Sequence, residues 1–182
     1  QFLNSRIAVQ AVIERNLLKS KDRVWFDTNP QGQPVLLSDN LKGLPKISLS
    51  HSGSAVAIAV SCGKGSVGVD IEIVEPIRTD AVRLVATNPN ELAWGHSQGR
   101  MSESEFVRTL WTIKESVWKS LGGPREISLS QISVDYDEGT ITPRVDFCKF
   151  AYDEFHTRLF AVQCEEVFPN TMLIRRSTAD IV

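Results

Sequence analysis

The sequence predicts an α+β fold in which a helix followed by antiparallel strands occurs twice along the chain. Apolar residues recur at helical spacing over 2–18 and again over 103–121. After these segments come short apolar runs bounded by Gly, Pro and Asn, which is typical of strands joined by turns. This order suits two pseudo-symmetric halves, each a helix with an antiparallel sheet, and an active site between them, although the sequence shows no convincing internal repeat.

The first half is expected to occupy residues 1–76, and its turn residues divide it into elements. Asn, Pro, Gly and Gln cluster over 27–34 and predict a turn, while Gly53, Gly63 and Gly65 separate apolar runs. The predicted elements are a helix over 2–18, a turn over 27–34, a short strand that begins at Val35, and strands over 47–50, 55–61 and 67–74 that form the first sheet, with His51-Ser52-Gly53 as a turn.

The second half is expected to occupy residues 77–182 and to contain a long helix. Ser102 and Glu105 have the spacing of a capping box at its start, and Gly122-Gly123-Pro124 ends it, since glycine and proline interrupt helices. The predicted elements are helices over 81–86, 89–94 and 103–121 and strands over 127–134, 140–147, 159–164 and 172–174.

Composition argues against several classes of protein. Of the 182 residues, 42% are hydrophobic, which is enough to form a buried core. The formal net charge of -2 gives the chain no overall attraction to nucleic acid. The cysteines match no metal motif, and no apolar run is long enough to span a bilayer. We expect a cytoplasmic monomer that binds neither nucleic acid nor a membrane. Because the chain begins at Gln1 rather than methionine, we also expect that an initial segment is missing.

Two short acidic motifs are the strongest functional signal. In the predicted strand over 67–74, Asp70 and Glu72 project from the same face because strand side chains alternate. In the predicted long helix, Glu115 and Lys119 stack at i and i+4. If the three carboxylates converge, they form a site for a hard cation such as Mg²⁺ beside a phosphate-bearing substrate. The alternatives are a strand edge that faces water and an exposed ion pair that only stabilises the helix.

Two further polar features complete the pattern. The first is the upstream segment Ser48-Leu49-Ser50-His51-Ser52-Gly53. Its small hydroxyl side chains and glycine let a phosphate approach backbone N–H groups, and its imidazole can add a hydrogen-bond donor; the alternative is a turn histidine bonded to local backbone. The second is Lys114, which is expected to face away from the Glu115 stripe, as a surface charge or one that faces an acceptor.

The three motifs, in this order, resemble the signature of the 4'-phosphopantetheinyl transferases, and the Sfp-type branch fits best. The resemblance covers the middle of the chain, from Gly32 to Val134. It implies two similar halves with the active site between them. It also implies that Asp70, Glu72 and Glu115 bind Mg²⁺, which contacts the pyrophosphate of coenzyme A, the donor substrate.

The same resemblance implies roles for other residues. Glu115 would also be the base for the acceptor serine hydroxyl, directly or through water, and Lys119 would stabilise the phosphate oxygens or the leaving group. Ser50 and His51 would grip the cofactor phosphates. The catalytic set is therefore Glu115, Lys119 and His51, and the coenzyme A set is Gly32, Gln33, Pro34, Ser50, His51 and Lys119, where Gln33 stands in place of the basic residue that relatives use.

The activity implied by the resemblance is Mg²⁺-dependent transfer. The enzyme would move the 4'-phosphopantetheine arm of coenzyme A to a serine of an apo acyl or peptidyl carrier protein and release 3',5'-ADP. Two alternatives use the same residues: a non-catalytic module of this fold that binds carrier proteins, and a metal-dependent phosphodiesterase.

Overall fold

The computed structural model of the chain describes positions 7, 9–11, 13, 14, 23–53, 55–61, 66–73, 89–97, 102–135, 140–142, 157–164 and 173–177, and the structure below is that of these residues. The residues described between positions 7 and 14 are helical. After them come, in chain order, β1 (Val24–Thr28), β2 (Pro34–Ser38), β3 (Lys46–Ser52), β4 (Ala55–Ser61), β5 (Ser66–Ile73), α3 (Pro89–Ser97), α4 (Glu103–Ser120), the 3-10 helix η1 (Leu129–Gln131), β6 (Ser133–Asp135), β7 (Thr140–Thr142), β8 (Thr157–Cys164) and β9 (Leu173–Ser177). Helices together with antiparallel sheets confirm the expected α+β class.

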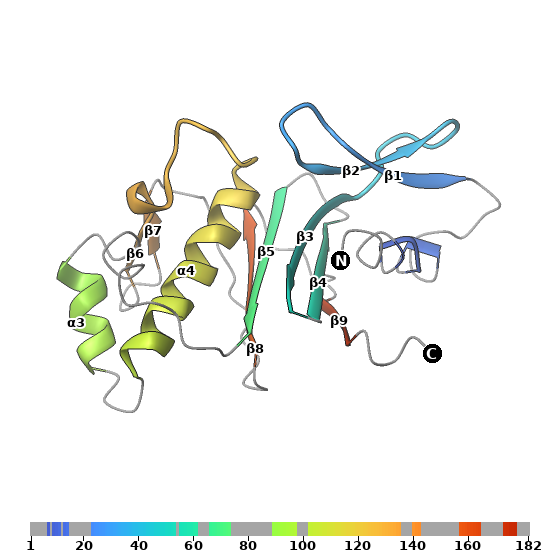
Figure 1. Ribbon diagram of the computed structural model, residues 1–182. Helices are drawn as coiled ribbons and strands as arrows, with labels where there is room; N and C mark the ends of the chain where they lie inside the picture. The colour runs from blue at the N-terminus through green and yellow to red at the C-terminus, as the bar shows by residue number, and fades with distance from the viewer. Residues whose placement is uncertain are drawn as a thin grey trace.

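Within the described residues, the strands form four separate antiparallel groups (Figure 1). The pairs are β1 with β2, β3 with β4, β4 with β9, β5 with β8, and β6 with β7. Strand β9 comes late in the chain yet lies beside β4, and β8 lies beside β5. Two strand pairings therefore join residues on either side of the boundary expected at residue 76.

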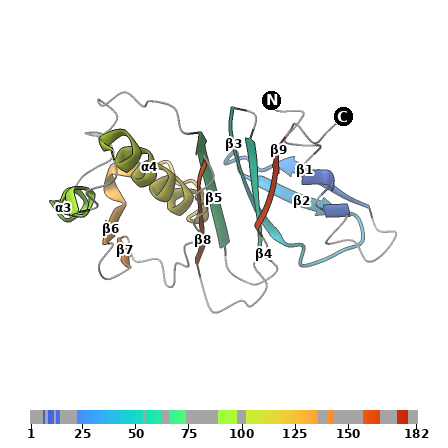
Figure 2. The same ribbon diagram turned by 90° about the horizontal axis from the view of Figure 1, so that it is seen from below.

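Strand β5 lies between helix α4 and the sheet of β3, β4 and β9 (Figure 2). Val67, Val69 and Ile71 alternate along β5 and form a buried cluster with Ala57 and Ala59 of β4. Because side chains on a strand alternate between its faces, the residues between these three point the other way, toward α4. The face of β5 that carries the acidic residues is therefore the face that the helix covers.

Gly68 brings α4 into direct contact with the backbone of β5. A Cβ atom at this position would lie 1.9 Å from the backbone oxygen of Ser116 and 2.7 Å from the backbone nitrogen of Ser120. A side chain at this point would push the helix away. The glycine therefore sets how closely the helix approaches the carboxylates of β5.

A second core holds the first half of the chain together. Val9 and Ile13 come from the helical residues at its start and pack with buried residues of four strands. This helix and the strands bury their apolar faces against each other, as the spacing of Val9 and Ile13 predicts for an amphipathic helix. The strand residues of this cluster are Val24, Leu36, Ile47, Val56 and Ile58.

Helix α4 begins and ends as its sequence predicts. The backbone N–H of Glu105 donates to the Ser102 side chain at 3.3 Å, and the backbone N–H of Ser102 donates to Glu105 Oε2 at 2.8 Å. At the other end, Gly122 and Gly123 have φ angles of 97° and 61°, which favour glycine. These ends confirm the predicted capping box and helix stop. No helix in the described part of the chain is long and apolar enough to cross a membrane.

The structure corrects the predicted boundaries of the first hairpin. The segment His51-Ser52-Gly53 was expected to be a turn, but His51 pairs with Val56 and Ser52 pairs with Ala55 in the β3–β4 ladder. Strand pairing therefore continues almost to the tip, and Gly53, with a φ of 55°, marks the turn.

Two other expectations about the first sheet were wrong. Strand β5 was expected to continue the sheet of β3 and β4, but its ladder partner is β8. Strand β1 was not predicted, and it takes Asp27 and Thr28 from the expected turn because they pair with Val35 and Pro34. Both differences arise because the partner of a strand lies elsewhere in the chain, and the spacing of apolar residues within the strand does not identify that partner.

In the second half, the strand expected over 127–134 is mostly a different structure. The backbone N–H of Ser128 donates to Gln131 Oε1 at 2.8 Å, and the backbone N–H of Gln131 donates to the Ser128 carbonyl at 3.0 Å. Such local bonds compete with strand pairing, so a 3-10 turn forms before β6. The helix expected over 81–86 and the strand residues 143–147 lie outside the described residues.

Candidate active site

The carboxylate of Asp70 is the centre of the site. This side chain is 1% exposed, and its Oδ1 accepts hydrogen bonds from Ser50 Oγ at 2.6 Å and from Lys119 Nζ at 2.7 Å. Its second oxygen, Oδ2, is also buried and accepts no hydrogen bond in the described part of the structure. A buried carboxylate oxygen is costly to leave without a donor or a cation. Asp70 therefore keeps one carboxylate oxygen that a cation could satisfy.

Lys119 joins the strand to the helix. Its ammonium group lies 2.7 Å from Asp70 Oδ1, 3.3 Å from Glu115 Oε2 and 3.2 Å from Ser50 Oγ. The Lys119 and Glu115 side chains are 22% and 27% exposed, so this i, i+4 pair faces the site rather than open solvent. The alternative that Glu115 and Lys119 form an ordinary exposed ion pair is wrong, because Lys119 also contacts Asp70, a buried acid of β5.

Three serines of β3 form a ladder along β5. Ser50 Oγ donates to Asp70 as described, and Ser52 Oγ donates to Glu72 Oε2 at 3.1 Å. Two residues before Ser50, Ser48 Oγ accepts from the backbone N–H of Val69 at 3.0 Å. The contacts of Ser48 and Ser52 were not predicted. The signal was present, since serines at every second position of one strand share a face, as the two acids do.

Electrostatics at the carboxylates favour an added cation. Burial, followed by the charge of Asp70, raises the pKa of Glu115 to about 7, and Lys119 opposes this shift. Burial and then the charge of Asp70 also raise the pKa of Glu72, against the effects of Ser52, Lys119 and Arg108. Burial and the nearby charge of Asp70 therefore both disfavour the ionised forms of Glu72 and Glu115, and a bound cation would offset both effects.

The carboxylates have the chemistry of a Mg²⁺ site, but their arrangement is not that of a bound metal. As the side chains stand, no three His, Cys, Asp or Glu residues of the described chain form a group that could hold a metal ion. The Lys119 ammonium group instead lies against Asp70 and Glu115. The hard oxygen donors, the unsatisfied Asp70 Oδ2 and the raised pKa values fit the ion. The assignment of Asp70, Glu72 and Glu115 as its ligands stays a prediction.

A cavity of about 490 Å³ lies next to Lys119. Its walls come from the turn before β2, the beginnings of β3 and β5, and the end of α4. Lys119 is the residue that this cavity shares with the carboxylate cluster, and Lys46 supplies a second cation to its lining. The cavity is lined by Gln31, Gly32, Gln33, Pro34, Val35, Lys46, Ile47, Ser48, Leu49, Ser66, Val67, Trp118, Lys119, Ser120, Leu121, Gly122 and Gly123.

The cofactor turn predicted at Gly32-Gln33-Pro34 lines this cavity and is held by Asn29. The Asn29 Oδ1 atom accepts from the backbone N–H of Gln33 at 2.8 Å, and Asn29 Nδ2 donates to Gln33 Oε1 at 2.8 Å. The Gln33 Nε2 atom lies 3.3 Å from the Cβ position that a side chain at Gly122 would occupy. Gln33 therefore reaches across the cavity edge toward the end of α4.

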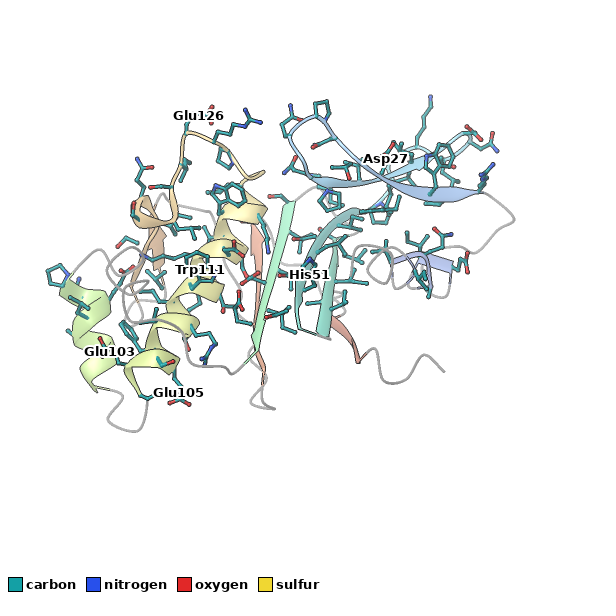
Figure 3. The ribbon with its side chains drawn as sticks, in the orientation of Figure 1. Asp27, His51, Glu103, Glu105, Trp111 and Glu126 are labelled. Atoms are coloured by element: carbon teal, nitrogen blue, oxygen red, sulfur yellow. The ribbon has the colours of Figure 1, made fainter. Side chains whose placement is uncertain are left out.

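His51 lies apart from the carboxylates. It is exposed on β3 (Figure 3). Alternation places it on the face of Ile47 and Leu49, opposite Ser50. The structure therefore brings Ser50 to Asp70 and leaves His51 outside both the cluster and the cavity lining. The phosphate-binding and catalytic roles of His51 stay predictions.

Lys114 is not the surface charge that helical spacing predicted. Its side chain is 0% exposed, and Nζ lies 3.0 Å from Oε1 of Glu91, a fully buried residue of α3. Glu91 Oε1 also accepts from the backbone N–H of Val134 at 2.9 Å. Burial lowers the pKa of Lys114, and the bond to Glu91 opposes that shift. The prediction failed because Glu91 of α3, which also bonds the backbone of β6, meets Lys114 on this face of α4.

Comparisons with known proteins agree with the motifs. The model of the 4'-phosphopantetheinyl transferase superfamily matches residues 66–163. A Synechocystis sp. protein with the provisional name 4'-phosphopantetheinyl transferase slr0495 is 28% identical over 137 residues, which are 74% of this chain and 54% of that protein. The 4'-phosphopantetheinyl transferase gsp of Aneurinibacillus migulanus is 28% identical over 117 residues, which are 64% of this chain and 46% of that protein.

The chain thus spans about half the length of the curated relatives that it matches. Among solved structures, the holo-[acyl-carrier-protein] synthase of Thermotoga maritima matches with a TM-score of 0.46 and 18% identity, over 56% of this chain and 64% of that one. The family match alone includes β5, α4 and β8, the elements that carry or support the carboxylates, and extends over more than half of the chain. The chain belongs to the 4'-phosphopantetheinyl transferase superfamily.

Proposed function

We propose that the chain transfers the 4'-phosphopantetheine arm of coenzyme A to a serine hydroxyl of an apo acyl or peptidyl carrier protein. The observation that carries this proposal is the position of Lys119. Its ammonium group contacts Asp70 and Glu115, and the same side chain lines the cavity of about 490 Å³. A phosphate bound at Lys119 would thus lie between a carboxylate cluster and a space for the rest of an organic donor.

The carboxylates supply the metal-binding side of this site. Asp70, Glu72 and Glu115 would hold Mg²⁺, and the ion would neutralise the charge that develops on the pyrophosphate of coenzyme A. Support comes from the unsatisfied Asp70 Oδ2 and from the raised pKa values of Glu72 and Glu115. Lys119 would stabilise the phosphate oxygens of the leaving group, since its side chain also faces the cavity.

Glu115 is suited to accept the proton of the acceptor serine. A general base must lie within reach of the hydroxyl whose proton it takes, and Glu115 Oε2 lies 3.3 Å from Lys119 Nζ, where the reacting phosphate would bind. In the proposed reaction the serine oxygen forms a bond with the β-phosphorus, and the bond from that phosphorus to the bridging oxygen breaks. The proton passes to Glu115, directly or through water, and 3',5'-ADP leaves.

The cavity provides the donor side of the site. Gln33, Lys46 and Lys119 present polar or charged groups in its lining, and Trp118 and Leu121 present apolar ones. We assign coenzyme A phosphates to the cationic end and the remaining parts of the molecule to the mixed walls. We also assign Gly32, Gln33 and Pro34 to this donor site, and their positions in the cavity lining support the assignment.

Intact-mass analysis of an apo carrier protein tests the proposal. The chain is incubated with coenzyme A, Mg²⁺ and carrier, and the controls are a carrier whose acceptor serine is replaced by alanine and a reaction with chelator. We expect the carrier mass to increase by one phosphopantetheine arm only in the complete reaction. Binding of coenzyme A without any mass increase across a panel of carriers would favour a non-catalytic module. Cleavage of coenzyme A without an acceptor would favour a phosphodiesterase.

A further inference from the structure

The serine ladder on β3 has a constant register with the acids of β5. Ser50 Oγ donates to Asp70 and Ser52 Oγ donates to Glu72, so residues two apart on β3 meet residues two apart on β5. The two bonds measure 2.6 Å and 3.1 Å, and both run from a hydroxyl donor to a carboxylate oxygen. The register means that β3 holds both carboxylates of β5 from the same side.

We propose that Ser50 and Ser52 are positioning residues that hold Asp70 and Glu72 in place for one divalent cation. This inference rests on the proposed function, because it takes these carboxylates as metal ligands. A carboxylate has two oxygens and several lone pairs, so one donated hydrogen bond fixes its rotamer and leaves room for a cation. Ligating carboxylates in metal sites are commonly oriented by such hydrogen bonds.

Ser52 carries the clearest part of the argument. Strand alternation alone would let the flexible Glu72 side chain adopt several rotamers, and Glu72 is only half-buried. The bond from Ser52 Oγ selects a rotamer in which Oε2 points toward β3. Ser50 also accepts a hydrogen bond from Lys119 Nζ at 3.2 Å, so its replacement would disturb the lysine of the site as well as Asp70.

Ser48 offers a matched comparison on the same face of β3. Its hydroxyl is buried and accepts from the backbone N–H of Val69 at 3.0 Å, so this bond joins it to the strand backbone rather than to a carboxylate. If the ladder only joins two strands, then Ser48 and Ser52 should behave alike when replaced. If Ser52 positions a metal ligand, its replacement should weaken metal binding and Ser48 replacement should not.

The experiment measures Mn²⁺ binding by electron paramagnetic resonance and thermal unfolding without metal, with no coenzyme A or carrier present. Ser52→Ala should weaken Mn²⁺ binding by about tenfold or more, as loss of a hydrogen bond to a ligand commonly does. Its melting temperature without metal should stay close to that of the unchanged chain. Ser52→Thr, which keeps the hydroxyl, should restore most of the affinity.

The control separates metal positioning from strand stability. Ser48→Ala should lower the melting temperature, because it leaves the buried Val69 N–H without its acceptor, and should keep the Mn²⁺ affinity of its folded fraction. Unchanged Mn²⁺ affinity in Ser52→Ala would overturn the inference, as would equal affinity losses in the Ser48 and Ser52 alanine variants. Absence of Mn²⁺ binding by the chain without any substitution would overturn it as well.

The outcome also distinguishes this inference from the proposed function. A chain that modifies carrier proteins while Ser52→Ala keeps full metal affinity would overturn the positioning role alone. A chain that binds Mn²⁺ through Ser52-dependent ligands and transfers nothing to any carrier would overturn the transferase proposal and leave the positioning role supported.

Discussion

Helix α4 carries two lysines that each meet an acid from another element, and the two sites differ in charge balance and in access. Lys114 and Glu91 are both 0% exposed, lie 3.0 Å apart, and form a closed pair in which Glu91 also accepts from the backbone of Val134. Lys119 meets Asp70 at 2.7 Å and Glu115 at 3.3 Å, and it is 22% exposed beside a cavity. We name these the closed pair and the open cluster.

The difference indicates which charges support the fold and which are available for chemistry. A buried ion pair of equal and opposite charges in good geometry is satisfied internally and has no need of a ligand. In the open cluster, by contrast, acids outnumber the lysine, and the pKa of Glu115 is raised to about 7. Excess charge together with access is the reason that we propose the open cluster as the place where a cation and a phosphate bind.

Breaking the closed pair should have the largest effect, and that effect should be on stability. Either Glu91→Gln or Lys114→Met leaves one buried charge without its partner, which typically costs about 3–5 kcal/mol of unfolding free energy. Chemical denaturation measures the loss. The double variant should recover most of it, because neither charge then remains buried. Losses that simply add in the double variant would contradict the view of Glu91 and Lys114 as a coupled pair.

Neutralising an acid of the open cluster should affect transfer rather than folding. Glu115→Gln keeps the shape of the side chain but removes a proposed metal ligand and base, so we expect carrier modification to slow about 100-fold or more. Glu103→Gln removes an exposed acid from the first turn of the same helix and is the matched control. Initial rates from intact-mass assays compare them. Near-normal transfer by Glu115→Gln would remove this residue from the mechanism.

The open cluster should also give the protein a pH-dependent stability in the absence of divalent cation. The pKa of Glu115 is about 7 in the folded chain against a usual 4.5, so between these values the folded state binds more protons than the unfolded state. The contribution of Glu115 to the free energy of unfolding should therefore be greatest below pH 4.5. This contribution should be lost as the pH rises through about 7.

Denaturation at a series of pH values with chelator present measures this slope. Glu115→Gln should flatten it, since the variant has no proton to release, and added Mg²⁺ should reduce it by stabilising the charged form. The double variant of the closed pair, in which neither buried group titrates, should keep the slope. An identical slope in Glu115→Gln would assign the pH dependence to other groups.

The smallest expected effect concerns Gln33, in the cavity wall away from the acids. Gln33→Lys adds a cation to a lining that already includes Lys46 and Lys119, so we expect coenzyme A to bind up to about tenfold more tightly after ordering and desolvation costs. Calorimetric titration at several salt concentrations should show that the gain shrinks as salt screens the charge.

A second ligand checks which phosphate is involved. If Gln33→Lys contacts the 3'-phosphate, dephospho-coenzyme A should bind the variant and the unchanged chain equally well. Unchanged affinity for coenzyme A itself would place the turn away from the donor, against its position in the cavity lining.

The sequence by itself determined the parts of this protein that depend on short-range order. The capping box of Ser102 and Glu105, the glycine stop after α4 and the alternation of Asp70 and Glu72 on β5 follow from rules that act over a few residues. The motif order also predicted the family, because motifs keep their order when loops change. The pairing of Glu115 with Lys119 likewise follows from helical spacing, which stacks residues at i and i+4 on one face.

Only the tertiary structure decided which distant groups meet. It joined Asp70 to Ser50 and Lys119, and it brought Ser52 to Glu72. It also buried Lys114 against Glu91 and turned His51 away from the cluster. Each of these contacts depends on how elements pack, and the local pattern of a helix or strand is compatible with several packings. A charged side chain needs a partner that satisfies it when water is excluded, and that partner is set by the fold.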